Sequence, residues 1–196
     1  MNPISQFEKT VDAIYGVYLD STNGFKQILD RHNKIQKQVL KDLQKTNPKL
    51  ATIDYLDQTS MIYGKGDPGK LEAYELHRST QKQYKERNME GGLNYLFIGN
   101  MVLVSLYHFW EDHYRSEIAI LFGKEKNGLK EPIMGDIRIL RNSIIHHAGI
   151  AKFDVEHCTL LKWFHKGDTI YLDNERLETI IYEIKGMIRR FQKQIE

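Results

Sequence analysis

The sequence predicts an all-α protein: a helical bundle with a small C-terminal β-hairpin and a surface insertion. Hydrophobic residues recur at intervals of three and four near both ends of the chain and around residues 136–148, which is the spacing of a helix with one buried face. Residues 93–122 are apolar nearly all round, as expected for the central helix of a bundle. Turn-rich polar sequence separates these segments.

Composition restricts the class of protein further. A length of 196 residues favours one domain, residues 1–196, with a core of its own. The hydrophobic fraction of 41% excludes a disordered chain, and a net charge of +2 gives no strong field that would indicate nucleic acid by itself. Cys158 is the only cysteine, which excludes an internal disulfide and a cysteine-based zinc site and fits a reducing compartment. The first residues carry acidic side chains and no apolar run, so we expect a cytoplasmic protein without a signal peptide.

The first part of the chain predicts two amphipathic helices, or one kinked helix, with the break at residues 20–24. The apolar positions are Phe7, Val11, Ile14, Tyr15 and Tyr18, followed by Phe25, Ile28, Leu29, Ile35, Val39 and Leu43. His32 falls on the second stripe, where a hydrogen-bonded structural histidine is expected. Lys34, Lys37, Lys41 and Lys45 line the other side; a solvated face is favoured, with an RNA-binding stripe as the alternative.

Residues 47–92 change in character and are expected to be the insertion. A turn-rich stretch is followed by a polar helix, predicted within residues 70–92 and ending at paired glycines. The segment GKGDPGK has the spacing of a phosphate-binding loop. Leu71 occupies the position where Ser or Thr would hold magnesium, and Pro68 removes a backbone N–H from the loop. We therefore do not expect a nucleotide site here.

The apolar segment 93–122 is interrupted by polar residues, which argues against a membrane span. Its HFWEDHYR stretch contains Glu111, Asp112 and Arg115. Glu111 and Arg115 are spaced for an ordinary ion pair within the helix. Alternatively, Glu111 or Asp112 orients Arg141 or His146, because charges in so apolar a helix need partners. A metal site is not expected, since the paired Glu-x-x-His helices of di-iron bundles are lacking.

The C-terminal part predicts the hairpin and a last helix. LLKWF, HKGD and TIYLD, residues 160–173, read as two short strands and a turn. The final helix has a clear apolar stripe made of Leu177, Ile180, Ile181, Ile184, Ile188, Phe191 and Ile195.

The helix expected over about residues 136–148 carries the most informative motif. At about 100° per residue, a stripe of Ile137, Leu140, Ile144 and Ala148 faces the core, with Arg141 at its edge. Asn142 and His146 share a face nearly opposite this stripe. Ile139 and Ile145 also lie outside the stripe, which indicates a second covered surface such as a dimer interface.

An arginine and a histidine on one helix end suit phosphodiester chemistry. RNA cleavage needs a base for the 2′-hydroxyl proton, an acid for the leaving oxygen and positive charge on the phosphorane. Histidine serves either proton-transfer role near neutral pH. Arginine binds phosphate through two hydrogen bonds. In a twofold dimer, two such pairs would supply acid and base without a metal.

The stretch LRNSIIHHAG, residues 140–149, resembles the signature of the HEPN superfamily. In this family an arginine, often followed by asparagine, precedes a histidine by four to six residues near the end of a helix in an α-bundle. Arg141, Asn142 and His146 match with four intervening residues, and His147 matches with five. The resemblance implies that Arg141 holds the scissile phosphate, His146 moves protons and Asn142 orients one of them. It also implies a polar residue facing the site, a role that Glu111 or Asp112 would fill.

The sequence thus predicts a HEPN-like homodimeric endoribonuclease that needs no metal or cofactor and acts on RNA. HEPN proteins of this kind are typical of toxins, antiviral defence systems and RNA processing. Two alternatives remain open. In the first, the same dimer lacks catalysis and binds RNA, a nucleotide or a protein partner. In the second, the chain is a toxin restrained by a cognate antitoxin or another defence-system partner.

Overall fold

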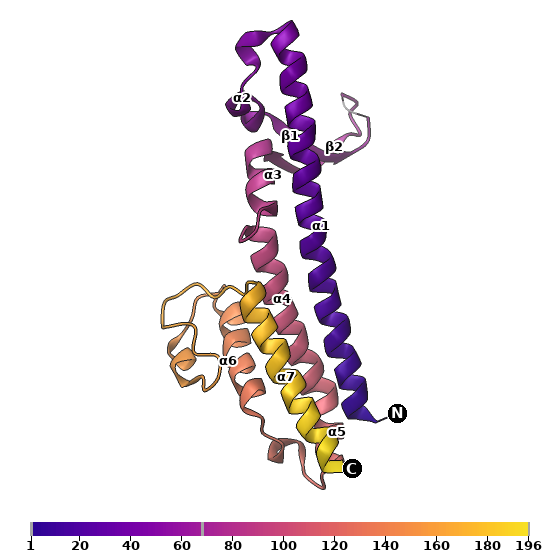
Figure 1. Ribbon diagram of the computed structural model, residues 1–196, viewed down its shortest axis with the longest axis vertical. Helices are drawn as coiled ribbons and strands as arrows, with labels where there is room; N and C mark the ends of the chain where they lie inside the picture. Colours follow the sequence, from indigo (N-terminus) through magenta and orange to yellow (C-terminus); the bar gives the residue numbers. More distant parts are fainter. Residues whose placement is uncertain (1, 68, 196) are drawn as a thin grey trace. The chain divides into compact units, whose positions relative to one another are not determined.

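The computed structural model of the protein describes residues 2–67 and 69–195 (Figure 1). Most of these residues are helical. Their contacts divide the chain into two compact units. One unit contains the described residues up to Ser21 and from Leu96 onward, and the other contains Thr22–Tyr95. The expected insertion, residues 47–92, lies inside the second unit, which also includes part of the N-terminal helix.

The N-terminal helix α1 (Pro3–Thr46) continues through residues 20–24 without interruption. Of the two alternatives, the prediction of two separate helices is therefore wrong, and a single helix forms. Asp, Ser, Thr and Asn each cost only a fraction of a kcal/mol in a helix interior, so packing overrides their preference for turns. Packing is present at this point, because the Tyr95 hydroxyl donates to the Thr22 carbonyl at 3.0 Å and the ring of Tyr95 lies 5.5 Å from that of Phe25.

The unit that carries the RNSIIHH motif is a helical bundle. Its elements are the first turns of α1, α4 (Leu93–Phe109, from Leu96 onward), the π-helical turn η2 (Trp110–Tyr114), α5 (Arg115–Leu121), the 3₁₀ turn η3 (Lys126–Gly128), α6 (Pro132–His146), the 3₁₀ turn η4 (Phe153–His157) and α7 (Asn174–Ile195). Helix α7 packs against α6, and Figure 1 shows the two helices side by side. Phe7 anchors α1 in the core, with ring centroids 5.4 Å from Trp110 and 5.3 Å from Tyr114. The expected central helix of residues 93–122 thus exists, with a π turn within it.

The predicted β-hairpin at residues 160–173 does not form. This segment contains no strand, and its only ladder contact is an isolated bridge between Ile150 and Thr169. Leu161, Phe164, Ile170 and Leu172 are all buried in the core of the unit. The alternating apolar residues therefore pack under the helices as an irregular loop, which produces the same hydrophobic pattern as a half-buried strand.

A buried carboxylate holds this loop against α6. Asp136 is 3% exposed and accepts hydrogen bonds from the backbone N–H groups of Thr159 at 3.0 Å, Leu160 at 2.6 Å and Leu161 at 2.9 Å. A loop without strand partners needs acceptors for its buried N–H groups. Asp136 supplies those acceptors from the helix that carries the motif.

Replacement of Asp136 by alanine is expected to lower the free energy of unfolding by about 3 kcal/mol, because the loop N–H groups would lose a charged acceptor. Urea denaturation followed by circular dichroism measures the change. Asp154→Ala is the matched control, since Asp154 is exposed and should change stability by less than about 0.5 kcal/mol. Equal stability of both variants would contradict this role of Asp136.

The second unit pairs the rest of α1 with a small α/β segment. This segment contains η1 (Pro48–Leu50), α2 (Ile53–Gln58), the antiparallel strands β1 (Ser60–Lys65) and β2 (Tyr74–Thr80), and α3 (Gln81–Asn88). The predicted polar helix is correct only from Gln81 onward, where Thr80 and Gln83 form a capping box. Residues 74–80 pair with β1 instead.

The GKGDPGK segment begins within β1 and continues into the connection between the two antiparallel strands. A phosphate-binding loop joins a buried parallel strand to a helix, so the context required for such a loop is missing. Pro68 lies outside the described residues. The sequence-based exclusion of a nucleotide site at this segment agrees with this topology.

A polar network joins α1 to α2 and α3. Gln36 is 3% exposed and donates to Asp57 at 3.0 Å and to Gln81 at 2.7 Å. Lys85 completes the network with an ion pair to Asp57 at 2.6 Å and a hydrogen bond to Gln36 at 3.2 Å. His32 lies beside it, with its ring 5.0 Å from that of Tyr84. Gln81 forms a side-chain hydrogen bond with His32, as expected of a structural histidine, while Nε2 of His32 is buried without a partner among the described residues.

Burial lowers the pKa of His32, and the charge of Lys85 adds to this effect. Because the folded pKa lies below the unfolded value of about 6.5, the folded state binds fewer protons in this range. The stabilisation is therefore complete above about pH 6.5 and is lost as the pH falls through the folded pKa. We expect unfolding free energies measured between about pH 8 and about pH 5 to fall more for the wild type than for His32→Gln. Parallel curves for the two proteins would contradict the shift.

Candidate functional site at the end of α6

The end of α6 presents the motif to solvent. Ala148 and Gly149 adopt positive φ angles of 51° and 80°. The N–H groups of His147 and Gly149 both donate to the Ser143 carbonyl, at 3.2 and 3.1 Å, which is a typical glycine-assisted helix ending. Ile137, Leu140 and Ser143 are buried, as the core stripe predicts for the first two. The prediction that Ala148 faces the core is wrong, because α6 ends at His146 and Ala148 is exposed. His146 and His147 are exposed in the last turn and just after it.

Arg141, Asn142 and His146 come together at this helix end. Nη1 of Arg141 lies 3.2 Å from Oδ1 of Asn142 and 3.4 Å from Nε2 of His146. An N–H donated by arginine requires an unprotonated imidazole nitrogen as acceptor. The contact therefore fits a tautomer of His146 in which Nε2 accepts from the guanidinium.

Arg141 differs from an ordinary surface charge, and His146 differs from its neighbour His147. Arg141 is only partly exposed and forms no ion pair with a described residue. Its positive charge therefore remains available to an anion. His147 makes no side-chain hydrogen bond within the described part of the chain, so His146, favoured by the helical angle, is the histidine beside Arg141.

The two carboxylates expected to support the motif are engaged elsewhere. Glu111 binds Arg115 at 2.8 Å, the ion pair expected from their spacing, and Lys126 at 2.9 Å. Burial alone would raise the pKa of Glu111, but the hydrogen bonds from Lys126 and Arg115 lower it below its usual value. Asp112 is exposed and pairs with His108 at 2.7 Å. The structure thus brings neither Glu111 nor Asp112 to Arg141 or His146.

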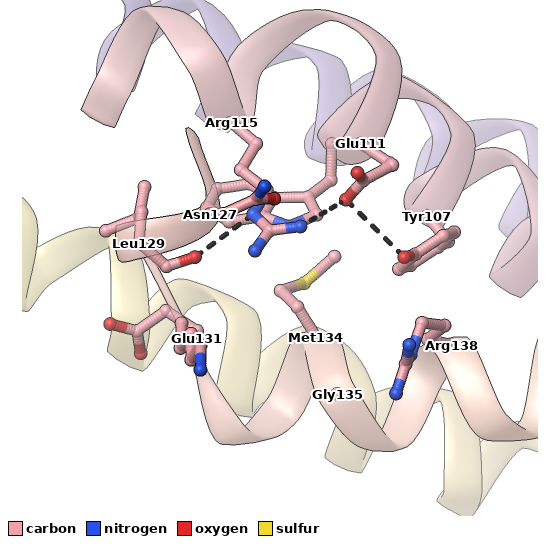
Figure 2. Close-up of a pocket in the computed structure, with 11 residues that line it drawn as sticks. Tyr107, Glu111, Arg115, Asn127, Leu129, Glu131, Met134, Gly135 and Arg138 are labelled. Carbon is pink, nitrogen blue, oxygen red and sulfur yellow. Dashed lines mark hydrogen bonds and ion pairs between the residues drawn. The ribbon is translucent and has the colours of Figure 1, made fainter. Parts of the chain in front are cut away.

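A pocket of about 570 Å³ opens between α6 and the helix that contains η2 (Figure 2). Figure 2 shows Tyr107, Glu111 and Arg115 on one wall and Met134, Gly135 and Arg138 of α6 on the other. The rest of the lining consists of Trp110, Asn127, Leu129, Lys130 and Glu131. The π turn at residues 110–114 contributes to the first wall; such turns are rare and often occur at functional sites.

Tyr107 lies between the charges of this pocket. Its hydroxyl donates to Glu111 at 3.4 Å. Burial raises the pKa of Tyr107, the carboxylate of Glu111 adds to the increase, and the charges of Arg138 and Arg115 oppose it. Tyr107 is therefore a neutral hydrogen-bonding group beside two guanidinium groups at physiological pH.

Sequence reasoning did not identify this pocket. Arg138 belongs to the same helix as the motif and precedes Arg141 by three residues and Asn142 by four. That spacing places Arg138 on the same face as Asn142. It is the feature of the sequence that could have indicated the pocket. The opposite wall depends on the π turn and on η3, which no periodicity predicts.

Other reactive groups are less suited to chemistry. Burial raises the pKa of the Cys158 thiol to about 12, with a contribution from the charge of Asp136, so this thiol is a poor nucleophile. Within residues 2–67 and 69–195, no three His, Cys, Asp or Glu side chains gather in a way that would hold a metal ion. None of the described helices has the length and apolar character needed to cross a membrane.

Comparison with known proteins gives no assignment: no protein-family model, no curated protein and no solved structure matches this chain.

Proposed function

We propose that the protein is a HEPN-type endoribonuclease that cleaves RNA without a metal ion, through Arg141 and His146. One observation carries the proposal: the guanidinium of Arg141 contacts both Asn142 and His146 at an exposed helix end and has no carboxylate partner among the described residues. A guanidinium, an imidazole and an amide so placed match the groups that phosphodiester cleavage requires.

Each residue has a defined role in this mechanism. When the substrate binds, the guanidinium of Arg141 turns from Nε2 of His146 to the phosphate. Nε2 then removes the proton of a ribose 2′-hydroxyl, and the 2′-oxygen attacks the adjacent phosphorus. Arg141 binds the non-bridging oxygens and stabilises the negative charge of the phosphorane. Asn142 holds the guanidinium in place through its side-chain oxygen. The bond to the 5′-oxygen then breaks, which leaves a 2′,3′-cyclic phosphate and, after protonation, a 5′-hydroxyl.

The proton for the leaving oxygen is proposed to come from His146 of the partner subunit in a homodimer. Exposed apolar side chains surround the helix end and offer a surface for a second copy. Ile145, Ile150 and Phe153 are 43%, 38% and 62% exposed. Their burial would place two copies of the motif near one twofold axis. Control of this activity by a cognate antitoxin or defence partner is part of the same proposal. Such control would not alter the chemistry of cleavage.

We expect Arg141→Ala and His146→Ala each to reduce the rate of RNA cleavage by at least about a hundredfold, because each removes a group that acts in the transition state. Gel analysis of cellular RNA incubated with equal amounts of each protein measures the rate. His147→Ala is the matched control, since it removes a neighbouring exposed imidazole that is not hydrogen-bonded to Arg141.

Thermal unfolding and sedimentation should be unchanged in all three variants, because the altered side chains lie outside the buried core. Cleavage that persists in both Arg141→Ala and His146→Ala would contradict the proposal. RNA binding without cleavage by the wild type would support the alternative of a non-catalytic RNA-binding module.

A further inference from the structure

The pocket beside α6 and Asn142 of the RNSIIHH motif lie on one face of that helix. At about 100° per residue, Glu131, Met134, Arg138, Asn142 and Ile145 fall within one quarter of the helix circumference. Arg138 and Asn142 are four residues apart, which is about 6 Å along the axis. A ligand in the pocket would therefore be within reach of a group bound at Arg141.

The charges of this pocket are unevenly compensated. Glu111 is paired with Arg115 and Lys126, and Glu131 is paired with Arg190 at 2.8 Å. Arg138 and Lys130 make no ion pair within the described part of the chain. Two lining cations thus lack a counter-charge while both lining carboxylates have one. The pocket is suited to an anionic ligand.

Gly135 forms part of the pocket wall. It lies within α6 and lines the pocket, yet a Cβ built on it would meet no atom within 4 Å. Glycine inside a helix costs about 1 kcal/mol relative to alanine. A side chain at this position would fit the helix and extend into the empty space. A larger side chain at this position can therefore be accommodated by the protein while it occupies space in the pocket.

We propose that this pocket binds a nucleotide of the RNA strand adjacent to the phosphodiester held by Arg141. Arg138 and Lys130 would contact its phosphate, and the half-buried ring and hydroxyl of Tyr107 would contact the sugar or base. A volume of about 570 Å³ is in the range of small-ligand sites. The identity of the strand as RNA rests on the proposed function; the anionic character and the open space come from the pocket itself.

The test uses a fluorescently labelled single-stranded RNA and the full chain carrying His146→Ala, so that binding is measured without cleavage. Gly135→Leu, added to this protein, fills the pocket, and Gly135→Ala is the matched control that leaves most of it open. Arg138→Gln removes an exposed cation that has no ion-pair partner among the described residues. Fluorescence anisotropy at several salt concentrations gives Kd and its salt dependence.

We expect Gly135→Leu and Arg138→Gln each to raise Kd about tenfold and Gly135→Ala to leave it unchanged. Arg138→Gln should also reduce the slope of log K against log salt by about one, the effect of losing a phosphate contact. Unfolding curves should show that each variant is folded. Unchanged Kd in both Gly135→Leu and Arg138→Gln, or no RNA binding by the His146→Ala protein itself, would overturn the pocket assignment.

The outcome is distinguishable from a failure of the proposed function. If the wild type cleaves RNA and the pocket variants bind RNA normally, the proposed nuclease function stands and the pocket assignment is wrong. If the pocket variants bind RNA more weakly and the wild type does not cleave it, the pocket assignment stands and the proposed nuclease function is wrong. Adenosine monophosphate is the second probe: binding that Gly135→Leu abolishes while RNA binding is unaffected would assign the pocket to a free nucleotide and overturn its assignment to the strand.

Discussion

The hydrogen bonds of the Asp136 carboxylate to the loop at residues 159–161 fix the helix on which the whole site depends. Asp136 is buried on one side of α6, and Arg138 lies nearly opposite it on the exposed side. Ile137 and Leu140 fill the core between the helices. With one side of α6 held by a charged hydrogen-bond centre and by apolar packing, the orientation of the other side is determined. The side chains of Arg138, Arg141 and Asn142 are thus presented from a rigid element, as positioning of a phosphate requires.

The charged side chains near the site fall into two groups. Some are paired with an opposite charge, and others have no ion pair among the described residues. On the wall opposite α6, Glu111 binds both Arg115 and Lys126, so these cations stabilise the turn that follows the apolar helix. Arg115 also donates to the carbonyl of Leu129 at 3.0 Å and ties this turn to the start of α6. Arg138 and Arg141 have no such ion pairs within the described residues. An anion that approaches the exposed face of α6 therefore meets uncompensated positive charge near the exposed imidazole of His146.

Much of α6 could be predicted from sequence because its pattern is local. The apolar spacing gave the core residues Ile137 and Leu140, and the helical angle distinguished His146 from His147. Residues 160–173 were misread because buried loop residues and strand residues have the same alternation; what separates them is the acceptor that satisfies the backbone, here Asp136. The strand at residues 74–80 was read as helix because its polar, exposed sequence carries no apolar alternation, and its pairing with residues 60–65 is a tertiary contact. Glu111 and Asp112 were plausible partners of the motif in sequence, but a helix fixes only local neighbours, and theirs are Arg115 and His108.

The chemical nature of the RNA ends tests the central claim most directly. Purified protein would be incubated with RNA in excess EDTA, and the termini of the fragments would be identified by enzymatic end-labelling and mass spectrometry. If His146 activates the 2′-hydroxyl while Arg141 stabilises the phosphorane, the fragments will carry 2′,3′-cyclic phosphate and 5′-hydroxyl ends. Fragments with 3′-hydroxyl and 5′-phosphate ends, or cleavage that EDTA abolishes, would contradict the account.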